Sequence, residues 1–366
     1  MQIEDIPRFK LTKDVFDSQV RLQMMMESCR SIEKKLMLRL AKTSMIRSVN
    51  SSLAIEGNGM KPYEVMDLLE GRTVIAPFDE LVETRNALDA YRRIDEFETW
   101  SVKGLLEAHD AIMFGLVETP GFRNHPVGVF DGEKLIYKAP DHGLVADMTG
   151  KLLDWGKESQ LPASITGAIV HFYIESIHPF PDGNGRMGRL WNSKILHDSD
   201  RLFDIVSMES GIRDRRDEYY EVLERCQSSE RQDCTEFIVF CIDCLTDQFG
   251  KLRRTDDPAM SRLLDAMTDA PMTSNEIMSI MGLSHKPSFM KTYMEPALRA
   301  GLVARTEDSL RSRNQRYRRL IERLRCMSDD LLRFDHRSDH RQSYTRRTVE
   351  VGMEDVAGKK QIAFNP

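Results

Sequence analysis

A twelve-residue run, HPFPDGNGRMGR at residues 178–189, constrains this chain more than any other stretch. It follows an apolar helical pattern at 162–177 and opens a second one that extends from about Asn184 to Leu196. The Asp-Gly-Asn-Gly segment cannot continue a helix comfortably, so the pattern predicts two helices joined by a tight loop. A fold that contains this run must therefore hold the ends of two helices around a short polar turn.

The same run contains the chemical groups that phosphate binding needs. Backbone N–H groups at the start of the second helix, reached through flexible glycines, form an anion site. Arg186 and Arg189 are three residues apart, so both can reach one side of that helix and grip a polyphosphate. Asp182 is a natural ligand for Mg²⁺ between phosphates, and His178 is the candidate general base. A lone His or Gly turn is more often structural, but here the groups occur together.

A second motif lies far upstream, where Ser52 and Glu56 are four residues apart. In a helical turn they share one face, and Gly57 and Gly59 then end the helix. Glu56 is left at the C-terminal end, where the helix dipole disfavours a carboxylate. The residues alone favour a solvated glutamate, with a cationic partner as the alternative.

Most of the remaining chain has helical patterns, with one exception before the central run. Residues 127–137 alternate around Asp-Gly, which predicts a short β-hairpin. Helical patterns cover residues 15–48, 62–99, 100–116, 143–157 and 213–250.

The C-terminal part begins after Asp256-Asp257-Pro258 and resembles a winged helix-turn-helix. Three short helices and the two strands of a wing are expected there, at residues 261–267, 274–281, 287–300, 301–305 and 314–318. Residues 332–366 are polar and poor in apolar anchors, so we expect a weakly ordered tail.

Composition narrows the class of protein. The net charge of -6 gives no global basic footprint, so the whole chain does not point to nucleic acid. No apolar run is long enough to span a bilayer and the N-terminus lacks a secretory h-region, so we expect no membrane association. Six scattered cysteines favour a reducing cytoplasm. Cys241 and Cys244 form a C-x-x-C, but in a mostly apolar helical run they are expected to be packing residues.

The central run resembles the Fic-domain pattern H-x-F-x-D-G-N-G-R-x-x-R and departs from it at no position. The resemblance covers roughly residues 45–250, and a winged helix is a frequent companion in that family. It implies a mainly α fold with a helical core and a β-hairpin flap. We divide the chain into an N-terminal helical region (1–100), the Fic core (101–250), the winged helix-turn-helix (257–325) and the tail (332–366).

The resemblance also implies an activity, the transfer of AMP from MgATP to a hydroxyl of a target protein or of the chain itself. His178 takes the proton from a Ser, Thr or Tyr hydroxyl, and Asp182 holds Mg²⁺. Gly183, Asn184 and Gly185 line the anion site, while Arg186 and Arg189 bind the β- and γ-phosphates. The flap aligns the target segment by strand addition through Leu135, Ile136, Tyr137 and Lys138.

Two further residues are placed by the same resemblance. Tyr219 is expected against the adenine, and Gln227 stands near a position that is often Asn. Many Fic proteins self-associate, so a homodimer is a further expectation.

Ser52-Leu-Ala-Ile-Glu56-Gly57 resembles the inhibitory motif of the family. There Glu56 pairs with Arg189 and withdraws it from the γ-phosphate, and the guanidinium offsets the unfavourable helix end. Removal of AMP by the same site, with Glu56 orienting a water, remains an open alternative. A DNA-binding regulator is the alternative from another class, supported by a local basic cluster at Arg311, Arg313, Arg316, Arg318, Arg319, Arg323 and Arg325.

Overall fold

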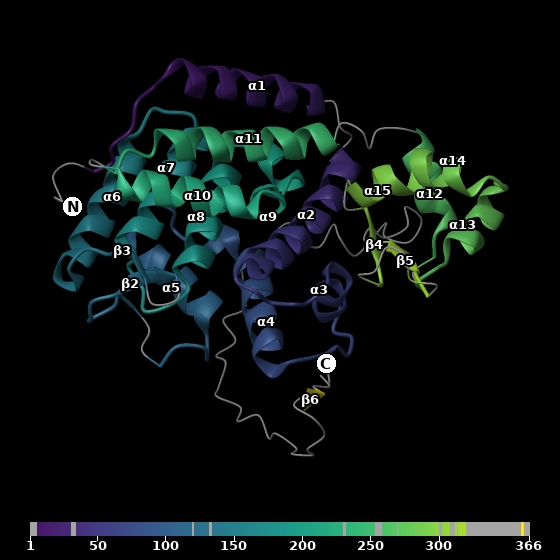
Figure 1. The fold of residues 1–366 in the computed structure, drawn as a ribbon, viewed down its shortest axis with the longest axis horizontal. Helices are drawn as coiled ribbons and strands as arrows, with labels where there is room; N and C mark the ends of the chain where they lie inside the picture. Colours follow the sequence, from purple (N-terminus) through teal and green to yellow (C-terminus); the bar gives the residue numbers. More distant parts are fainter. Residues whose placement is uncertain are drawn as a thin grey trace, which may run out of the picture.

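The computed structural model is mainly helical, as the sequence predicts (Figure 1). It describes residues 6–30, 34–118, 121–131, 134–229, 232–252, 258–268, 270–299, 302–307, 312, 314–319 and 360–361.

The N-terminal region holds two helices where one was expected over 15–48. Helix α1 (Lys13–Cys29) ends at the cap residue Arg30, and α2 (Lys34–Ile55) runs in a different direction (Figure 1). No Gly or Pro marks this break, so tertiary packing decides it. The buried side of α1, with Val15 and Leu22, lies along α11 (Thr235–Leu252), whereas α2 continues towards the central helices.

The helix expected over 62–99 is also interrupted. It consists of α3 (Pro62–Leu69), α4 (Phe78–Arg92) and a 3₁₀ turn at Ile94–Glu96. Gly71 adopts a positive φ of 70° after α3, and Pro77 caps α4, so the sequence did contain signals for this break. Between the two helices β1 (Ile75–Ala76) pairs antiparallel with β6 (Lys360–Gln361).

The core is a stack of helices around α7 (Ala163–Ile177), which is buried along almost its whole length, as expected for a central helix. Helix α8 (Asn184–Ser199) packs closely against it. The remaining core helices are α5 (Val102–Met113), α6 (Val145–Glu158), α9 (Met208–Asp214) and α10 (Arg216–Ser228), with 3₁₀ turns at His142–Leu144 and Arg201–Ile205.

A buried carboxylate ties four of these helices together. Glu209 on α9 accepts hydrogen bonds from Ser48 of α2 (2.6 Å), Tyr91 of α4 (2.9 Å) and Ser193 of α8 (2.6 Å). Ser207, the N-cap of α9, adds a fourth at 3.3 Å. Because a buried charge is tolerable only when it is hydrogen-bonded, this cluster fixes how α2 approaches the core.

The expected hairpin is present as β2 (Gly128–Asp131) and β3 (Lys134–Lys138). The strands are antiparallel, with Gly128 opposite Lys138 and a register shift between Val129 and Phe130. The Ala139 amide donates to the Val127 carbonyl at the open end of the hairpin.

The C-terminal unit has a methionine-rich core of its own. The sequence predicted three helices and two strands, and the observed elements are α12 (Pro258–Ala266), α13 (Ser274–Met281), a third helix with a π-helical middle, and a hairpin. The third helix comprises α14 (Lys286–Phe289), Met290–Met294 and α15 (Glu295–Arg299), and the antiparallel strands are β4 (Val303–Arg305) and β5 (Tyr317–Arg319).

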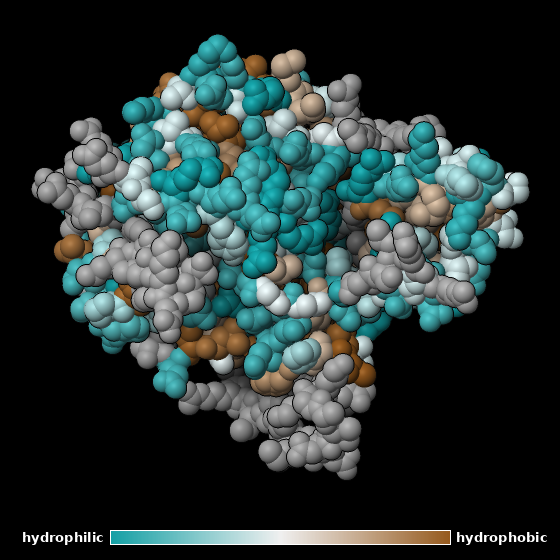
Figure 2. Space-filling view, viewed as in Figure 1, coloured by the Kyte–Doolittle hydropathy of each residue, from teal (hydrophilic) through white to brown (hydrophobic). Residues whose placement is uncertain are grey.

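The expected tail at 332–366 lies outside the described residues except for Lys360–Gln361. No helix in the described ranges has both the length and the apolar character that a bilayer crossing requires. The face shown in Figure 2 is mostly hydrophilic, with apolar patches that include one near the top, where α1 lies in Figure 1. Cys241 and Cys244 are both buried and unbridged in α11, in keeping with a packing role.

Candidate active site

The central run forms a tight turn between α7 and α8, as expected. His178 caps α7 in the left-handed region (φ 52°, ψ 59°), which directs the chain away from the helix axis. Gly183 caps α8 with φ 81°, and a Cβ on it would lie 2.5 Å from the Met113 sulfur. Only glycine meets both the backbone and the space requirement at this position.

Two side chains brace the turn from within. The Asn184 side chain accepts from the Phe180 amide and donates to the Phe180 carbonyl, both at 2.9 Å. His109 of α5 stacks on the Phe180 ring at 3.8 Å and donates through Nε2 to the Asp182 carbonyl at 3.0 Å. Phe180 itself is fully buried, so the turn is anchored in the core at its centre.

The ring of His178 is oriented by the helix that precedes it. Its Nδ1 lies 3.3 Å from the Glu175 carbonyl, which can only accept, so Nδ1 carries the proton and the Nε2 lone pair is available as a base. Burial lowers the pKa of His178 below its usual 6.5, a shift that the hydrogen bond to Glu175 opposes and the charge of Arg123 reinforces. The ring is therefore neutral at pH 7.

The first turn of α8 has groups that are suited to bind an anion. Among the described residues no acceptor bonds the backbone N–H groups of Asn184, Gly185 or Arg186. Arg186 lies between Glu83 of α4 and Asp182, both at 3.4 Å, and its buried Nε has no hydrogen-bond partner in the described part of the chain. Unsatisfied amides and a weakly held guanidinium fit a phosphate group.

Asp182 is suited to bind a metal ion that also binds the phosphates of a ligand. Its side chain is 67% exposed and lies 3.4 Å from the Arg186 guanidinium. The described residues contain no group of three or more metal-ligating side chains, so they do not form an all-protein cage. Mg²⁺ is commonly held by one or two carboxylates together with substrate phosphates, and Asp182 supplies that kind of ligand.

Arg189, the second arginine of the run, is 1% exposed and bonds both α2 and the residue that follows it. It donates through Nε to the Ser52 hydroxyl (3.0 Å), and through Nη2 to the Ser52 carbonyl (3.1 Å) and to Glu56 Oε1 (2.6 Å). Burial favours a raised pKa for Glu56, but the charge and hydrogen bond of Arg189 outweigh it and hold that pKa below 4.5. The ion pair is therefore intact at neutral pH.

A second carboxylate lies behind this pair. Glu175 of α7 is buried, and its Oε1 accepts from the Tyr219 hydroxyl at 3.0 Å. Burial raises its pKa to about 7, against the attraction of Arg189, and the nearby Glu56 charge adds to the increase. A Cβ on Gly185 would lie 2.6 Å from Glu56 Oε1, 3.1 Å from Arg189 Nη1 and 3.3 Å from Glu175 Oε1, so all three groups surround that glycine.

Comparison with known proteins agrees with this geometry. A model of the Fic/DOC family matches residues 99–196, and one of the C-terminal domain of Fic-like "filamentation induced by cAMP" proteins matches 258–320. The crystal structure of a Fic family protein from Desulfovibrio desulfuricans is 34% identical, with a TM-score of 0.65. The match covers 86% of this chain and 98% of that one.

The chain belongs to the Fic family.

Other Fic relatives are more distant. A fragment of Fic-1 from C. elegans shares the fold at 20% identity and a TM-score of 0.54, over 67% of this chain and 73% of that one. Proteins named "Protein adenylyltransferase Fic" are 25% identical in Culex quinquefasciatus and 26% in Aedes aegypti, over 56% of this chain. The chain spans 41% of the length of each of these two relatives.

The structure also gives the surroundings of three further expected site residues. Tyr219 is 1% exposed with its hydroxyl on Glu175, so its ring offers no open face to a base, whereas Tyr220 beside it is exposed. Gln227 is buried and donates to Ser176 at 3.3 Å, behind α7. Asn184 uses its side chain to brace the turn, which leaves only its backbone for the anion site.

The flap residues Leu135 to Lys138 form β3, as expected, and β3 passes close to α10. The backbone of the strand is thus near the helix that carries Tyr219 and Tyr220. The position of these four residues on one strand is what the expectation of strand addition requires.

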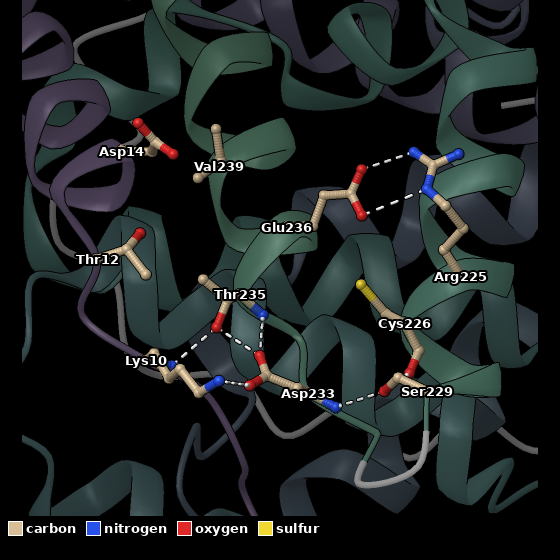
Figure 3. Close-up of a pocket in the computed structure, with 10 residues that line it drawn as sticks. All are labelled: Lys10, Thr12, Asp14, Arg225, Cys226, Ser229, Asp233, Thr235, Glu236 and Val239. Atoms are coloured by element: carbon tan, nitrogen blue, oxygen red, sulfur yellow. Dashed lines mark hydrogen bonds and ion pairs between the residues drawn. The ribbon is translucent and has the colours of Figure 1, made fainter.

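A surface groove of about 490 Å³ lies elsewhere, between the start of α1 and the facing ends of α10 and α11 (Figure 3). Its polar groups bond one another: Asp233 bonds Thr235 and Lys10, and Arg225 bonds Glu236. Burial raises the pKa of Cys226 to about 11, so its thiol is protonated at neutral pH. These bonded groups are therefore already satisfied, and the protonated thiol of Cys226 is not a reactive nucleophile.

The structure also reveals residues that sequence reasoning missed, namely His109, Arg123 and Glu175. A glutamate inside the apolar helix before His178 was a signal that could have been noticed. His109 and Arg123 have no comparable signal, because their roles depend on contacts 73 and 55 residues away in the sequence.

Proposed function

We propose that the chain transfers AMP from MgATP to a Ser, Thr or Tyr hydroxyl of a target protein or of itself, and that Glu56 restrains this activity. The proposal is carried by one observation. A neutral His178 with an available Nε2 precedes the start of α8, where no acceptor in the described residues bonds the amides of Asn184, Gly185 and Arg186, while Arg189 on the same helix is bonded to Glu56.

The residues of the turn divide the reaction between them. The target oxygen forms a bond to the α-phosphorus, the bond to pyrophosphate breaks, and Nε2 of His178 takes the hydroxyl proton. The amides of Gly185 and Arg186 bind phosphate oxygens, and the guanidinium groups of Arg186 and Arg189 neutralise the remaining charge. A bound Mg²⁺ supplies further charge neutralisation, with Asp182 as its protein ligand.

Glu56 opposes binding of the phosphates by forming an ion pair with Arg189. While the 2.6 Å ion pair persists, the guanidinium cannot bind a terminal phosphate. Glu56 is 38% exposed, so an incoming group can reach it from solvent, whereas Arg189 is buried and holds its place. The restraint therefore acts through the glutamate, and its removal leaves Arg189 available to ATP.

Labelling with α-³²P-ATP tests both parts of the proposal. Glu56→Gly should incorporate label into itself or a lysate target at least about 10-fold faster than wild type, the effect of about 1.4 kcal/mol. His178→Ala in that background should abolish incorporation. Glu70→Gly is the matched control, because Glu70 also follows a helix and pairs with cations, Lys42 and Arg72, but lies outside the site. Equal labelling by Glu56→Gly and wild type would contradict the restraint.

Removal of AMP by the same site is a second candidate. Within the described residues only Oε1 of Glu56 is hydrogen-bonded, which leaves Oε2 able to orient a water. Release of AMP from a premodified target by wild type, lost in Glu56→Gly, would favour this direction. Three arginines of the basic cluster are described. Arg318 and Arg319 are buried and bonded to Asp67 and to the Leu264 carbonyl, and the exposed Arg316 lies 3.6 Å from Glu276, so the cluster gives DNA binding little support.

A further inference from the structure

We propose that Arg123 is a positioning residue that couples the β2–β3 hairpin to His178. This inference rests on the proposed function, because it assigns the hairpin the task of presenting a target hydroxyl. Arg123 does not touch the reacting atoms in this scheme. Its role is to set the distance between the strand that aligns the target and the base that accepts its proton.

Arg123 donates to four backbone carbonyl groups. The guanidinium donates to His178 (Nε, 2.7 Å), Pro140 (Nη2, 2.6 Å), His125 (Nη1, 3.0 Å) and Ile177 (Nη2, 3.3 Å). The Arg123 amide also donates to the Pro179 carbonyl at 2.9 Å. With 2% of its surface exposed, the residue is enclosed by the segments that it joins.

One set of these carbonyls belongs to the end of α7. Ile177 and His178 close that helix, where carbonyl groups lack helical partners and the dipole is negative, so a cation stabilises them. His178 is also held in the left-handed region, which costs about 1 kcal/mol for a non-glycine residue. The bond from Arg123 to its carbonyl helps to hold this conformation.

The other set belongs to the two ends of the hairpin. His125 precedes β2 and Pro140 follows β3, so a single planar group contacts both sides of its base. A rigid group that bonds both the base of the hairpin and the end of the helix fixes the spacing between them. The guanidinium provides that span because its donors lie in a fixed fork, which a lysine ammonium cannot reproduce.

Transfer to a protein hydroxyl needs the hairpin in register with His178, whereas binding of nucleotide to α8 does not. In the Glu56→Gly background, Arg123→Lys should therefore lower the rate of label transfer at saturating ATP about 100-fold, as expected for a reacting group displaced by about 1 Å. The affinity for α,β-methylene ATP, measured by calorimetry, should change less than about 2-fold. A merely structural residue would not separate the two measurements.

Hydrogen–deuterium exchange tests the coupling without reference to activity. Backbone amides of Gly128–Asp131 and Lys134–Lys138 should exchange about 10-fold faster or more in Arg123→Lys, while those at the centre of α7 stay protected. Arg47→Lys is the matched control, since Arg47 is a partly buried arginine on α2 that is bonded to Gln248 of α11. Unchanged hairpin exchange, or equal losses of transfer in the two lysine variants, would overturn the proposal. Absence of labelling in Glu56→Gly alone would instead count against the proposed function.

Discussion

At the scale of single residues, the site combines one arginine with two glutamates that differ in solvent exposure. Arg189 is buried between two carboxylates, of which Glu56 is partly exposed and Glu175 is not. Opposite charges at short range keep Arg189 and Glu56 ionised, whereas burial favours the neutral form of Glu175. The same guanidinium thus has one permanently charged neighbour and one that titrates near pH 7.

His178 should act as a base well below neutral pH. Its lowered pKa means that the neutral ring predominates at pH 6.5 and above, so the rate of AMP transfer by Glu56→Gly should be flat there and fall only at lower pH. Initial rates between about pH 5 and pH 8, at saturating MgATP, measure the acid limb. A midpoint above the ordinary histidine value of 6.5 would contradict this assignment of the base.

Glu175 should make the stability of the fold depend on pH. Its pKa is about 7 in the folded chain against 4.5 when unperturbed, so the unfolded chain loses this proton first as pH rises. The resulting stability is fully present below pH 4.5 and is lost as pH rises through about 7, a change of about 3 kcal/mol. Urea unfolding of wild type and Glu175→Gln should show this slope only in wild type. Glu107→Gln, an exposed change on α5, serves as control and should keep the wild-type slope.

At the scale of elements, the turn depends on how closely α7 and α8 approach. Gly188 of α8 faces His171 of α7, and a Cβ there would lie 2.6 Å from His171 Cδ2. His171 is fully buried, with its Nε2 3.2 Å from the Tyr219 hydroxyl, so it cannot withdraw without disturbing Glu175. Because this contact is glycine, α7 and α8 pack closely, and the end of α7 that carries His178 lies near the start of α8 that carries the two arginines.

Gly188→Ala should therefore destabilise the chain by about 1–3 kcal/mol through overpacking, despite the higher helix propensity of alanine. Gly250→Ala in α11 is the matched control, because a Cβ there meets no atom within 4 Å. That change should stabilise by up to about 1 kcal/mol. Chemical denaturation of both variants measures the difference, and equal effects would show that the α7–α8 contact is not tight.

The sequence predicted elements well where their signals are local. The turn between α7 and α8 contains the glycines that predict it. Helix α13 begins and ends at the expected residues, because Thr273 and Glu276 form a capping box and Gly282 ends the helix. The break after Cys29 and the π-helical turn at Met290–Met294 have no local signal. They depend on which neighbouring helix each segment packs against, and a single sequence does not encode that in any short pattern.

At the scale of the whole molecule, the C-terminal unit is joined to the helical region that carries Glu56. Arg318 of β5 donates to both carboxylate oxygens of Asp67 on α3, at 2.7 and 2.6 Å. Arg72 also binds Asp67, at 2.7 Å, and the Arg318 guanidinium lies 6.0 Å from the Tyr63 ring. The sequence suggested that Arg318 belongs to a basic surface. It did not predict the pair with Asp67, because that partner is 251 residues away and no local pattern indicates it.

Breaking this pair should loosen the C-terminal unit without unfolding the core. Both side chains are mostly buried, so Asp67→Asn removes a charge that offsets the desolvation of Arg318, at a local cost of about 3 kcal/mol. The backbone amides of α13 should then exchange faster, since the C-terminal unit has a separate hydrophobic core. The unfolding midpoint of the main core, reported by the buried Trp191, should change no more than it does in the control variant Glu107→Gln. Protection of α13 equal to wild type would mean that apolar packing, and not the ion pair, holds the two parts together. Replacing Arg318 with Met in the Asp67→Asn chain should restore part of the protection, because it removes the unpaired buried charge.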